Sequence, residues 1–392
     1  MNLENDFQKL RVAIVCDWLT SRGGAAKVEE VIAEIFPSAD IYTSVCNPNL
    51  FPWLKGRKIF TTWLNKIPYF RNKHQLFAWL RPILFESFDF GGYDLVISSS
   101  SAESKCVITK PETLHVCYCH TPIRYYWSDY HEYIRERLEF GILNPLVRLV
   151  MPRMVFDLRM NDRMSAERVD LFVANSKYIA SRIKKYYRRD AKVIYPPVEV
   201  NQRFNIQYPI SNKSHENKTG EKQEDFYLFV GRLVPYKKAD LVVEAFVENG
   251  RNLKVIGEGP MLGKVKKLSQ GSENIEFLGF GNDEIKMEIM KKCKAVIFPS
   301  LEDFGIVPVE AMSLGKPVVA FGQGGARESI VDGVTGVFFE RQKVKSLNEA
   351  IERLEGSEFD SEKIIERAKI FSKERFCREF EEFILDNIKK LL

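Results

Sequence analysis

The sequence predicts an α/β protein built from two doubly wound, Rossmann-like domains, and three observations support this. Apolar runs typical of buried parallel strands alternate with helical runs. The alternation stops at Pro196-Pro197 and a polar stretch, and then resumes. At 392 residues, the chain is also longer than one ordinary hydrophobic core accommodates. We therefore expect two such domains facing each other across a cleft.

The first series of elements begins with a predicted strand at Arg11–Cys16. A turn that ends in Gly23-Gly24 leads from this strand into a helix over about 25–35. Further strands are predicted at 41–43, 95–98, 114–119, 171–174 and 193–194. These elements assign residues 1–199 to the N-terminal domain.

The second series follows a polar stretch, residues 200–225, which we interpret as a linker with an exposed, mobile loop. Its strands are predicted at 226–230, 253–256, 275–278, 295–298 and 318–320, with helices at about 239–248 and 262–268. Residues 226–372 then form the C-terminal domain. Residues 373–392, part of a helical run from 361, are expected to return to the first domain.

Composition places the chain among ordinary globular proteins, with a net charge of +5 that suits anionic ligands. No apolar run of about 18 residues predicts a membrane span, and the first residues do not resemble a secretory signal. The seven cysteines are odd in number and lack a framework spacing, which indicates a reducing compartment. Cys117 and Cys119 are expected to be buried thiols rather than metal ligands.

Two carboxylates flank a predicted helix start in the second series. The run 294–298 reads as a strand, so Glu302 is expected at its C-terminal tip, and Gly305 opens the next helix. Glu310 then lies on the first turns of that helix. Ligands of open α/β sheets bind in this crevice, and a helix N-terminus favours a phosphate or a sugar hydroxyl. A carboxylate there can accept two hydrogen bonds from a ribose diol.

A basic turn follows the first strand of the same series. Arg232 comes directly after Gly231, and Lys237-Lys238 precede the next helix. A guanidinium fork and an ammonium together neutralise a diphosphate leaving group well. The alternative is a solvated basic turn, which the nearby pair of glutamates disfavours.

Three further positions are candidates in the first domain. His120 follows the strand 114–119, where an imidazole can hydrogen-bond a sugar hydroxyl, unless it is a partly buried histidine held by the backbone. Gly23-Gly24 let a phosphate or an acceptor approach the backbone, although an ordinary tight turn explains them as well. Ser176 is interpreted as a helix N-cap.

Two stretches combine cations with aromatic residues. Residues 51–90 hold Trp53, Trp63 and Trp79 among many Lys and Arg, with only two acids. Residues 177–189 carry six cations and no acid, with aromatic side chains on one expected helix face. This composition favours peripheral contact with an anionic membrane. The alternative is that the aromatic side chains are core and the cations are solvated.

Together these motifs resemble the retaining glycosyltransferases of the GT-B fold, family 4 (glycosyltransferase group 1). The resemblance extends over about 11–390 and is carried by Gly-Arg-x4-Lys at 231–237, Glu-x7-Glu at 302–310, Gly324-Gly325 and Gly23-Gly24. The segments 117–125 and 230–238 are similar to mannosyltransferases that build bacterial O-antigen and other surface polysaccharides.

The resemblance implies how the nucleotide part of a donor is bound. Arg232 and Lys237 would bind the diphosphate, Glu310 would bind the ribose hydroxyls, and Gly23-Gly24 would lie near the phosphate and the acceptor. Lys238 stands where many relatives have Gly, so either lysine can meet the phosphate. The spacing to Arg232 favours Lys237.

The resemblance also implies how the donor sugar is held. Glu302, with backbone groups near Phe304, Gly305 and Ile306, would bind the sugar on the side of the second domain. His120 would contact the same sugar from the first domain, which is the acceptor side.

The implied reaction transfers a hexose, mannose from GDP-mannose, to a hydroxyl of a glycan or polyprenyl-linked glycan. The anomeric configuration would be retained through front-face displacement. No Asp-x-Asp motif occurs, so neither a metal nor another cofactor is expected. We expect a cytoplasmic protein that acts at the inner face of the membrane and binds no nucleic acid.

Two other classes of function remain open at this stage. A nucleotide-sugar epimerase on the same scaffold would release free sugar without an acceptor. A phosphorylase would need a pyridoxal lysine that the sequence does not identify. A non-catalytic module that binds a sugar nucleotide or a nucleic acid is the alternative outside enzymes.

Overall fold

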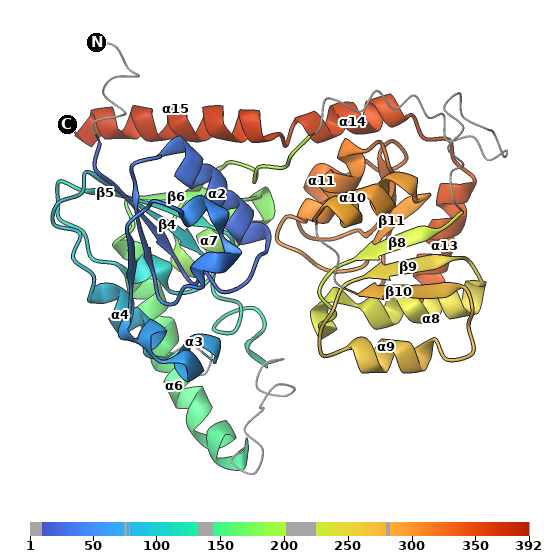
Figure 1. Ribbon diagram of the computed structural model, residues 1–392, viewed down its shortest axis with the longest axis horizontal. Helices are drawn as coiled ribbons and strands as arrows, with labels where there is room; N and C mark the ends of the chain where they lie inside the picture. Colours follow the sequence, from blue (N-terminus) through green and yellow to red (C-terminus); the bar gives the residue numbers. More distant parts are fainter. Residues whose placement is uncertain are drawn as a thin grey trace. The chain divides into compact units, whose positions relative to one another are not determined.

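The computed structural model describes residues 10–73, 77, 79–131, 144–200, 225–279 and 283–391 (Figure 1). The chain divides into two compact units. Unit 1 consists of Met1–Pro197 with Phe376–Leu392, and unit 2 consists of Val198–Arg375. Most of the stretch predicted as a linker, 201–224, lies outside the described residues.

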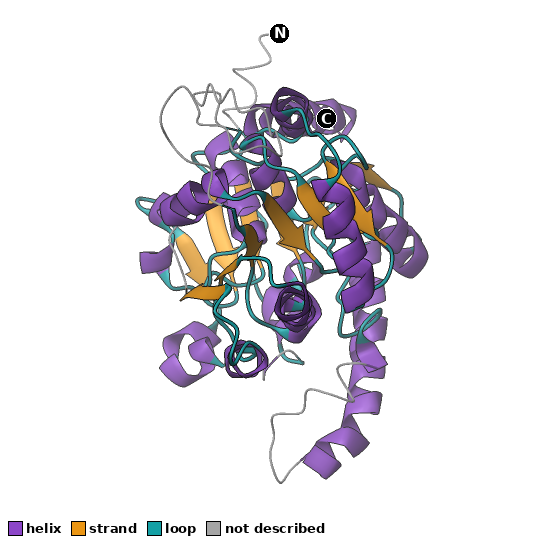
Figure 2. Cartoon of the chain, turned by 90° about the vertical axis from the view of Figure 1, so that its right-hand side faces the viewer, coloured by secondary structure: helices purple, strands orange, loops and turns teal. Residues whose placement is uncertain are grey.

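Unit 1 contains a parallel sheet whose seven described strands have the order β3-β2-β1-β4-β5-β6-β7. The strands are β1 (Val12–Cys16), β2 (Asp40–Thr43), β3 (Ile59–Thr61), β4 (Leu95–Ser100), β5 (Leu114–Cys119), β6 (Leu171–Ala174) and β7 (Ala191–Val193). The helices of this unit are α2 (Gly24–Ile35), α3 (Pro68–Asn72), α4 (Arg81–Glu86), α6 (Asn144–Glu167) and α7 (Lys177–Tyr187). Helices lie on both faces of the sheet (Figures 1 and 2).

The alternation of side chains along the strands of unit 1 makes two hydrophobic layers. Ile14 and Ile97 pack with α2 on one face, whereas Val15 and Val96 pack on the other. The last helix, α15 (Lys373–Leu391), completes the first layer, since Phe376 and other apolar residues of it join that core. The predicted return of the C-terminal helix to the first domain is therefore confirmed.

Unit 2 repeats the architecture with a parallel sheet of order β10-β9-β8-β11-β12-β13 among the described strands. Its strands are β8 (Tyr227–Val230), β9 (Leu253–Ile256), β10 (Ile275–Gly279), β11 (Ala295–Phe298), β12 (Val318–Phe321) and β13 (Gly336–Phe339). Its helices are α8 (Ala239–Asn249), α9 (Leu262–Leu268), α10 (Asp283–Lys292), α11 (Ile306–Ser313), α12 (Ala326–Ser329), α13 (Val344–Glu355) and α14 (Ser361–Lys369). Figure 2 shows strands of this unit between helices.

The structure adds elements that the sequence pattern did not predict, among them β3, β13 and α13. It also divides the helical run from 361 onwards into α14 and α15. At this break, the backbone N–H of Val198 donates to the carbonyl of Phe371 at 3.0 Å. The segment that follows Pro196-Pro197 is thus tied to the turn between α14 and α15.

All seven cysteines are free, and Cys117 and Cys119 are buried, as predicted. In the described part of the chain, no helix combines the length and the apolar character that crossing a membrane requires.

Candidate functional site

The candidate site in unit 2 lies where the strand order reverses. β8 and β11 are neighbours at the middle of the sheet, and the chain continues outward from them in opposite directions. In open α/β sheets this switch point is where loops separate and leave a crevice at the carboxyl ends of the strands. The loop after β8 carries Arg232 and Lys237, and the loop after β11 carries Glu302.

The loop after β8 is fixed by backbone contacts with the loop after β9. Gly231 N–H donates to Ile256 O at 3.0 Å, and Leu233 N–H donates to Glu258 O at 2.8 Å. The approach is so close that a Cβ atom at Gly257 would overlap the carbonyl of Gly231. The loop that carries Arg232 is therefore held rigidly, while the Arg232 side chain itself is exposed and makes no ion pair with any described residue.

Lys237 and Glu302 meet across the switch point. The distance from Lys237 Nζ to Glu302 Oε1 is 2.5 Å, and both side chains are mostly buried. The contact is ionic but lacks hydrogen-bond geometry, so this buried Oε1 atom has no hydrogen-bond partner in the structure. A carboxylate oxygen has more than one lone pair, so Oε1 can accept from a hydroxyl donor while it remains paired with Lys237.

Two glycines hold the Glu302 loop against the start of α12. Gly325 N–H donates to Glu302 O at 2.9 Å. A Cβ atom at Gly325 would overlap the backbone of Asp303 and Phe304, and Gly324 has a φ of +70°. The Gly324-Gly325 pair of the sequence motif therefore exists because only glycine permits the close approach that fixes Glu302.

Helix α11 begins beside this loop. Gly305 precedes it with a φ of +89° and provides no side-chain cap, so the motif's glycine again satisfies a backbone requirement. Ile306 is the first residue of the helix, and Phe304 is buried with its ring 5.4 Å from that of Phe371. The helix thus presents its N-terminus at the carboxyl edge of the sheet, where its dipole favours an anion.

Glu310 lies in the second turn of α11 and is paired with Lys286 of α10. Glu310 Oε2 is 2.9 Å from Lys286 Nζ, and the side chains are only 6% and 11% exposed. Burial lowers the pKa of Lys286, but the charges of Glu310 and Asp283 raise it by more, so the net shift is upward and the lysine stays charged. Sequence reasoning found Glu310 but missed Lys286.

His120 of unit 1 follows β5, at the carboxyl edge of that sheet. Its backbone is fixed on both sides, since its N–H donates to Ser100 O at 2.8 Å and its carbonyl accepts from Asn175 Nδ2 at 3.0 Å. Its Nε2 atom is 2.8 Å from Ser99 Oγ. Burial lowers the pKa of His120 to about 4, so the ring is neutral near pH 7.

The loops at the switch point of unit 1 are joined by Asp17, which the sequence analysis did not single out. Its carboxylate accepts from the backbone N–H groups of Ser101, Ala102 and Ser104 at 2.6–2.8 Å. Nearby, Gly23 precedes α2 in an extended conformation, and no atom lies within 4 Å of the position of an added Cβ. The Gly23-Gly24 turn is exposed, so neither packing nor backbone strain demands glycine at position 23.

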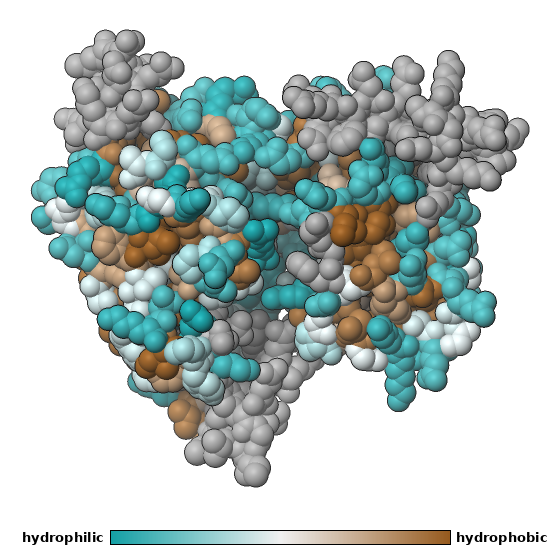
Figure 3. All heavy atoms as spheres, in the orientation of Figure 1, coloured by the Kyte–Doolittle hydropathy of each residue, from teal (hydrophilic) through white to brown (hydrophobic). Residues whose placement is uncertain are grey.

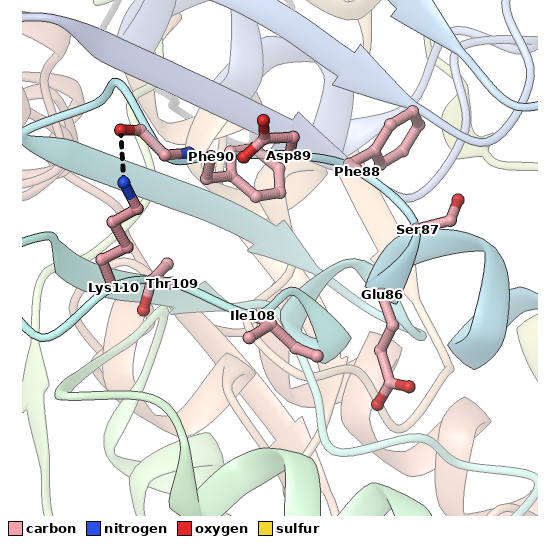
Figure 4. Close-up of a pocket in the computed structure, with 9 residues that line it drawn as sticks. Glu86, Ser87, Phe88, Asp89, Phe90, Ile108, Thr109 and Lys110 are labelled. Carbon is pink, nitrogen blue, oxygen red and sulfur yellow. Dashed lines mark hydrogen bonds between the residues drawn. The ribbon is translucent and has the colours of Figure 1, made fainter.

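A surface hollow of about 320 Å³ lies at the other edge of the unit 1 sheet (Figure 4). Its lining comes from the segments before β4 and β5, and Lys110 Nζ donates to Gly91 O across it at 3.1 Å. Because this hollow is at the amino ends of the strands, it is separate from His120.

The two cation-rich stretches differ in how far their apolar side chains are buried. Ile179, Ile183 and Tyr187 of α7 are buried, and Tyr186 stacks on Trp127 at 5.0 Å. The apolar face of 177–189 is therefore core, which is the alternative that the sequence left open for this stretch. Ser176 is the N-cap of this helix, as predicted, and accepts from Ile179 N–H at 3.0 Å.

Residues 63–83 do carry exposed apolar side chains. They are Trp63, Ile67, Tyr69, Trp79 and Ile83, between 41% and 64% exposed. Figure 3 shows apolar residues among hydrophilic ones on the part of unit 1 that carries α3 and α4.

The two parallel sheets with flanking helices define the class of the protein, a two-domain GT-B fold. The Anabaena protein HepE, in a crystal structure with UDP, superposes with a TM-score of 0.65 at 20% identity, over 96% of this chain and 99% of that chain. This likeness concerns the fold.

The sequence comparisons find relatives for about half of the chain. Residues 211–371 match the family described as Glycosyl transferases group 1. A Methanocaldococcus jannaschii protein described as an uncharacterized glycosyltransferase is 31% identical over 207 residues, 52% of this chain and 55% of that protein. The alpha-1,3/1,6-mannosyltransferase ALG2 of Homo sapiens is 29% identical over 252 residues, 57% of this chain and 59% of the relative. The chain thus spans little more than half the length of these relatives. Over residues 211–371, the chain is thus similar to the group 1 glycosyltransferases.

Proposed function

We propose that this protein transfers a hexose from a nucleotide sugar to a hydroxyl of a glycan or lipid-linked glycan, with mannose from GDP-mannose as the donor. The observation that carries the proposal is the contact of Lys237 with Glu302 at the switch point of unit 2. A cation suited to a diphosphate and a carboxylate suited to sugar hydroxyls lie side by side there, next to the N-terminus of α11.

The roles of the donor-binding residues follow from their contacts. The exposed guanidinium of Arg232 and the ammonium of Lys237 bind the diphosphate, with Lys238 as the second candidate. Glu302 accepts from sugar hydroxyls through its Oε1 atom, which has an ionic contact but no hydrogen bond. Glu310, held in place by its ion pair with Lys286, accepts from the ribose hydroxyls.

In the proposed step, the acceptor hydroxyl oxygen forms a bond to the anomeric carbon on the face from which the leaving group departs. The bond between that carbon and the phosphate oxygen breaks, and the nucleoside diphosphate leaves with the bonding electron pair. The hydroxyl proton passes to a leaving phosphate oxygen. Arg232 and Lys237 stabilise the negative charge that develops on the phosphate, so this step is proposed to need no metal.

Mannose is proposed because ALG2 proteins, described as alpha-1,3/1,6-mannosyltransferases, are among the relatives that match half of the chain. HepE, the structural neighbour, was crystallised with UDP and with UDP-glucose. UDP-glucose is therefore the donor to compare with GDP-mannose. A synthesis of surface polysaccharide such as O-antigen is the proposed setting.

Calorimetric titration of the full chain with GDP-mannose and UDP-glucose tests the donor. We expect GDP-mannose to bind more tightly than UDP-glucose. Arg232→Ala should weaken binding and lower turnover on the order of 10²–10³-fold, and Glu310→Ala should weaken binding of GDP. Lys267→Ala, at an exposed position on α9, is the matched loss of a cation. Binding that is unchanged in Arg232→Ala, or weakened equally in Lys267→Ala, would refute the site.

A second measurement separates transfer from epimerisation. The chain is incubated with GDP-mannose alone and with a polyprenyl-linked glycan added. Transfer requires the acceptor and releases GDP, whereas an epimerase releases a free sugar epimer without it.

We also propose that the exposed apolar side chains of residues 63–83, with Lys66 and Lys73 beside them, contact an anionic membrane on the cytoplasmic side. Vesicles with and without phosphatidylglycerol, sedimented with the protein, test this proposal. Binding to the anionic vesicles should decrease in Tyr69→Ala, and equal sedimentation with both vesicle types would contradict it.

A further inference from the structure

A carboxyl group is buried behind His120. Glu29 lies on α2 between Val28 and Ile32 on the face that packs into the core, and it is only 4% exposed. Burial of a carboxyl group is costly unless it is hydrogen-bonded. Its surroundings raise the pKa of Glu29 to about 8, chiefly through burial. A residue kept in such a position despite this cost points to a role other than packing.

Ser99 joins this carboxyl group to the histidine. Its Oγ atom donates to Glu29 Oε1 at 3.1 Å and lies 2.8 Å from His120 Nε2. Ser99 is near the carboxyl end of β4, in register with Cys16 of β1 and Tyr118 of β5. The three side chains therefore come from three different elements of unit 1 and form one chain of contacts.

The chemistry of a hydroxyl group fixes the direction of these contacts. A serine has one proton to donate and lone pairs that accept. Glu29 can accept this proton at Oε1 even when its carboxyl group carries a proton on Oε2, and in this arrangement the oxygen of Ser99 accepts from His120. The histidine then carries its proton on Nε2, and its Nδ1 atom is left with a lone pair.

The Nδ1 atom is available to a ligand. His120 is half-buried, and within the described residues no hydrogen bond reaches Nδ1. The backbone contacts to Ser100 and Asn175 fix the position of the ring. The ring is neutral near pH 7, so its tautomer decides whether this edge donates or accepts.

A second Ser–His pair on the same two strands provides the comparison. Ser98 Oγ lies 2.9 Å from His115 Nε2, on the opposite face of the sheet because the residues alternate. His115 is fully buried, and its Nδ1 atom has no partner in the structure. No acid among the described residues accepts from Ser98. This pair has the serine and the histidine without the carboxyl group and without access to solvent.

We propose that Ser99 and Glu29 are positioning residues that hold His120 in its Nε2–H tautomer, so that Nδ1 accepts a hydrogen bond from a hydroxyl of the sugar substrate. The inference rests on the proposed function, because a sugar hydroxyl is the donor that gives Nδ1 its role. Glu29 orients Ser99, Ser99 orients the imidazole, and only His120 touches the substrate.

The tautomer is tested without any substrate. Long-range ¹H–¹⁵N spectra of the full chain with ¹⁵N-labelled histidine distinguish the Nε2–H from the Nδ1–H form, and the His120→Gln spectrum assigns the signal. We expect Nε2–H for His120 in the wild type, a mixture of tautomers in Ser99→Ala, and the wild-type signal in Ser98→Ala. An Nδ1–H form in the wild type, or the same signal in Ser99→Ala as in the wild type, would overturn the proposal.

The kinetic test uses the donor that supports transfer. Ser99→Ala should lower kcat roughly tenfold, the effect of one hydrogen bond of ordinary strength. Ser99→Thr, which keeps the hydroxyl, and Glu29→Gln, which keeps an acceptor, should retain most of the wild-type kcat. Ser98→Ala should not change kcat. Wild-type kcat in Ser99→Ala would refute the role. If no donor supports transfer, the proposed function fails, and the spectra still decide the tautomer.

Discussion

Removal of the Lys286 ammonium tests the buried pair beneath the proposed ribose site. The variant Lys286→Met keeps most of the side-chain length and removes the charge. Glu310 is 6% exposed and Lys286 11% exposed, so the carboxylate would lose its cation in a site that water barely reaches. Breaking a buried pair in this way costs about 3–5 kcal/mol. We expect about 3 kcal/mol, because Glu310 has further contacts.

The assay is urea unfolding of the full chain followed by far-ultraviolet circular dichroism. The five tryptophans all lie within 18–127, so their emission reports on unit 1 and serves as an internal control. The double variant Lys286→Met with Glu310→Gln removes both charges and should recover part of the lost stability. A loss below about 1 kcal/mol in the single variant, or a double variant less stable than the single one, would refute the account of a buried pair.

Two further predictions concern the backbone of the Glu302 loop and the carboxyl group of Glu29. Gly325→Ala places a Cβ atom against the backbone of Phe304, so it should destabilise the protein by at least about 2 kcal/mol. Gly263→Ala on α9, where no atom lies within 4 Å of the added group, should not destabilise the protein. Equal melting temperatures of the two variants would contradict this expectation. For Glu29, the folded pKa of about 8 exceeds the unfolded value, so its contribution to stability is complete below about pH 4.5 and is lost as the pH rises through 8. Relative to wild type, Glu29→Gln should therefore gain about 3 kcal/mol between pH 5 and pH 8 in urea unfolding, and a pH-independent difference would contradict the shift.

The strands at the centre of both sheets could be predicted because they are buried on both faces and read as continuous apolar runs. The edges could not. β3 is short and half-exposed, and its residues resemble the basic and aromatic stretch around them. β13 begins with Gly336, where an added Cβ atom would overlap the carbonyl of Val318. The close approach of the neighbouring strand therefore requires glycine, a residue whose presence does not indicate a strand.

The candidate site shows a similar division. Lys237 and Glu302 were identified from their spacing, and the structure brings them into contact. Lys286 was missed because it lies three residues after Asp283, and a pair of opposite charges at this spacing is typical of the exposed face of a helix. Its burial depends on how α10 packs against α11, which local sequence does not encode.

Glu29 could have been found from the sequence. It lies three residues before Ile32 and next to Val28, on the apolar stripe of α2 rather than on the polar face. A charged residue at a core position of an amphipathic helix is a signal of function. In contrast, the burial of Tyr186 depends on Trp127, which is distant in the sequence, so composition alone suggested an exposed surface that the fold does not have.

The central claim is that the diphosphate of a nucleotide sugar is bound in unit 2 by the loops that follow β8 and β11. A crystal structure of the chain with GDP-mannose tests it most directly. The account predicts phosphate oxygens within hydrogen-bond distance of Arg232 and Lys237, with the sugar against Glu302. A diphosphate bound elsewhere, such as the hollow beside Lys110, with both loops empty, would contradict the account.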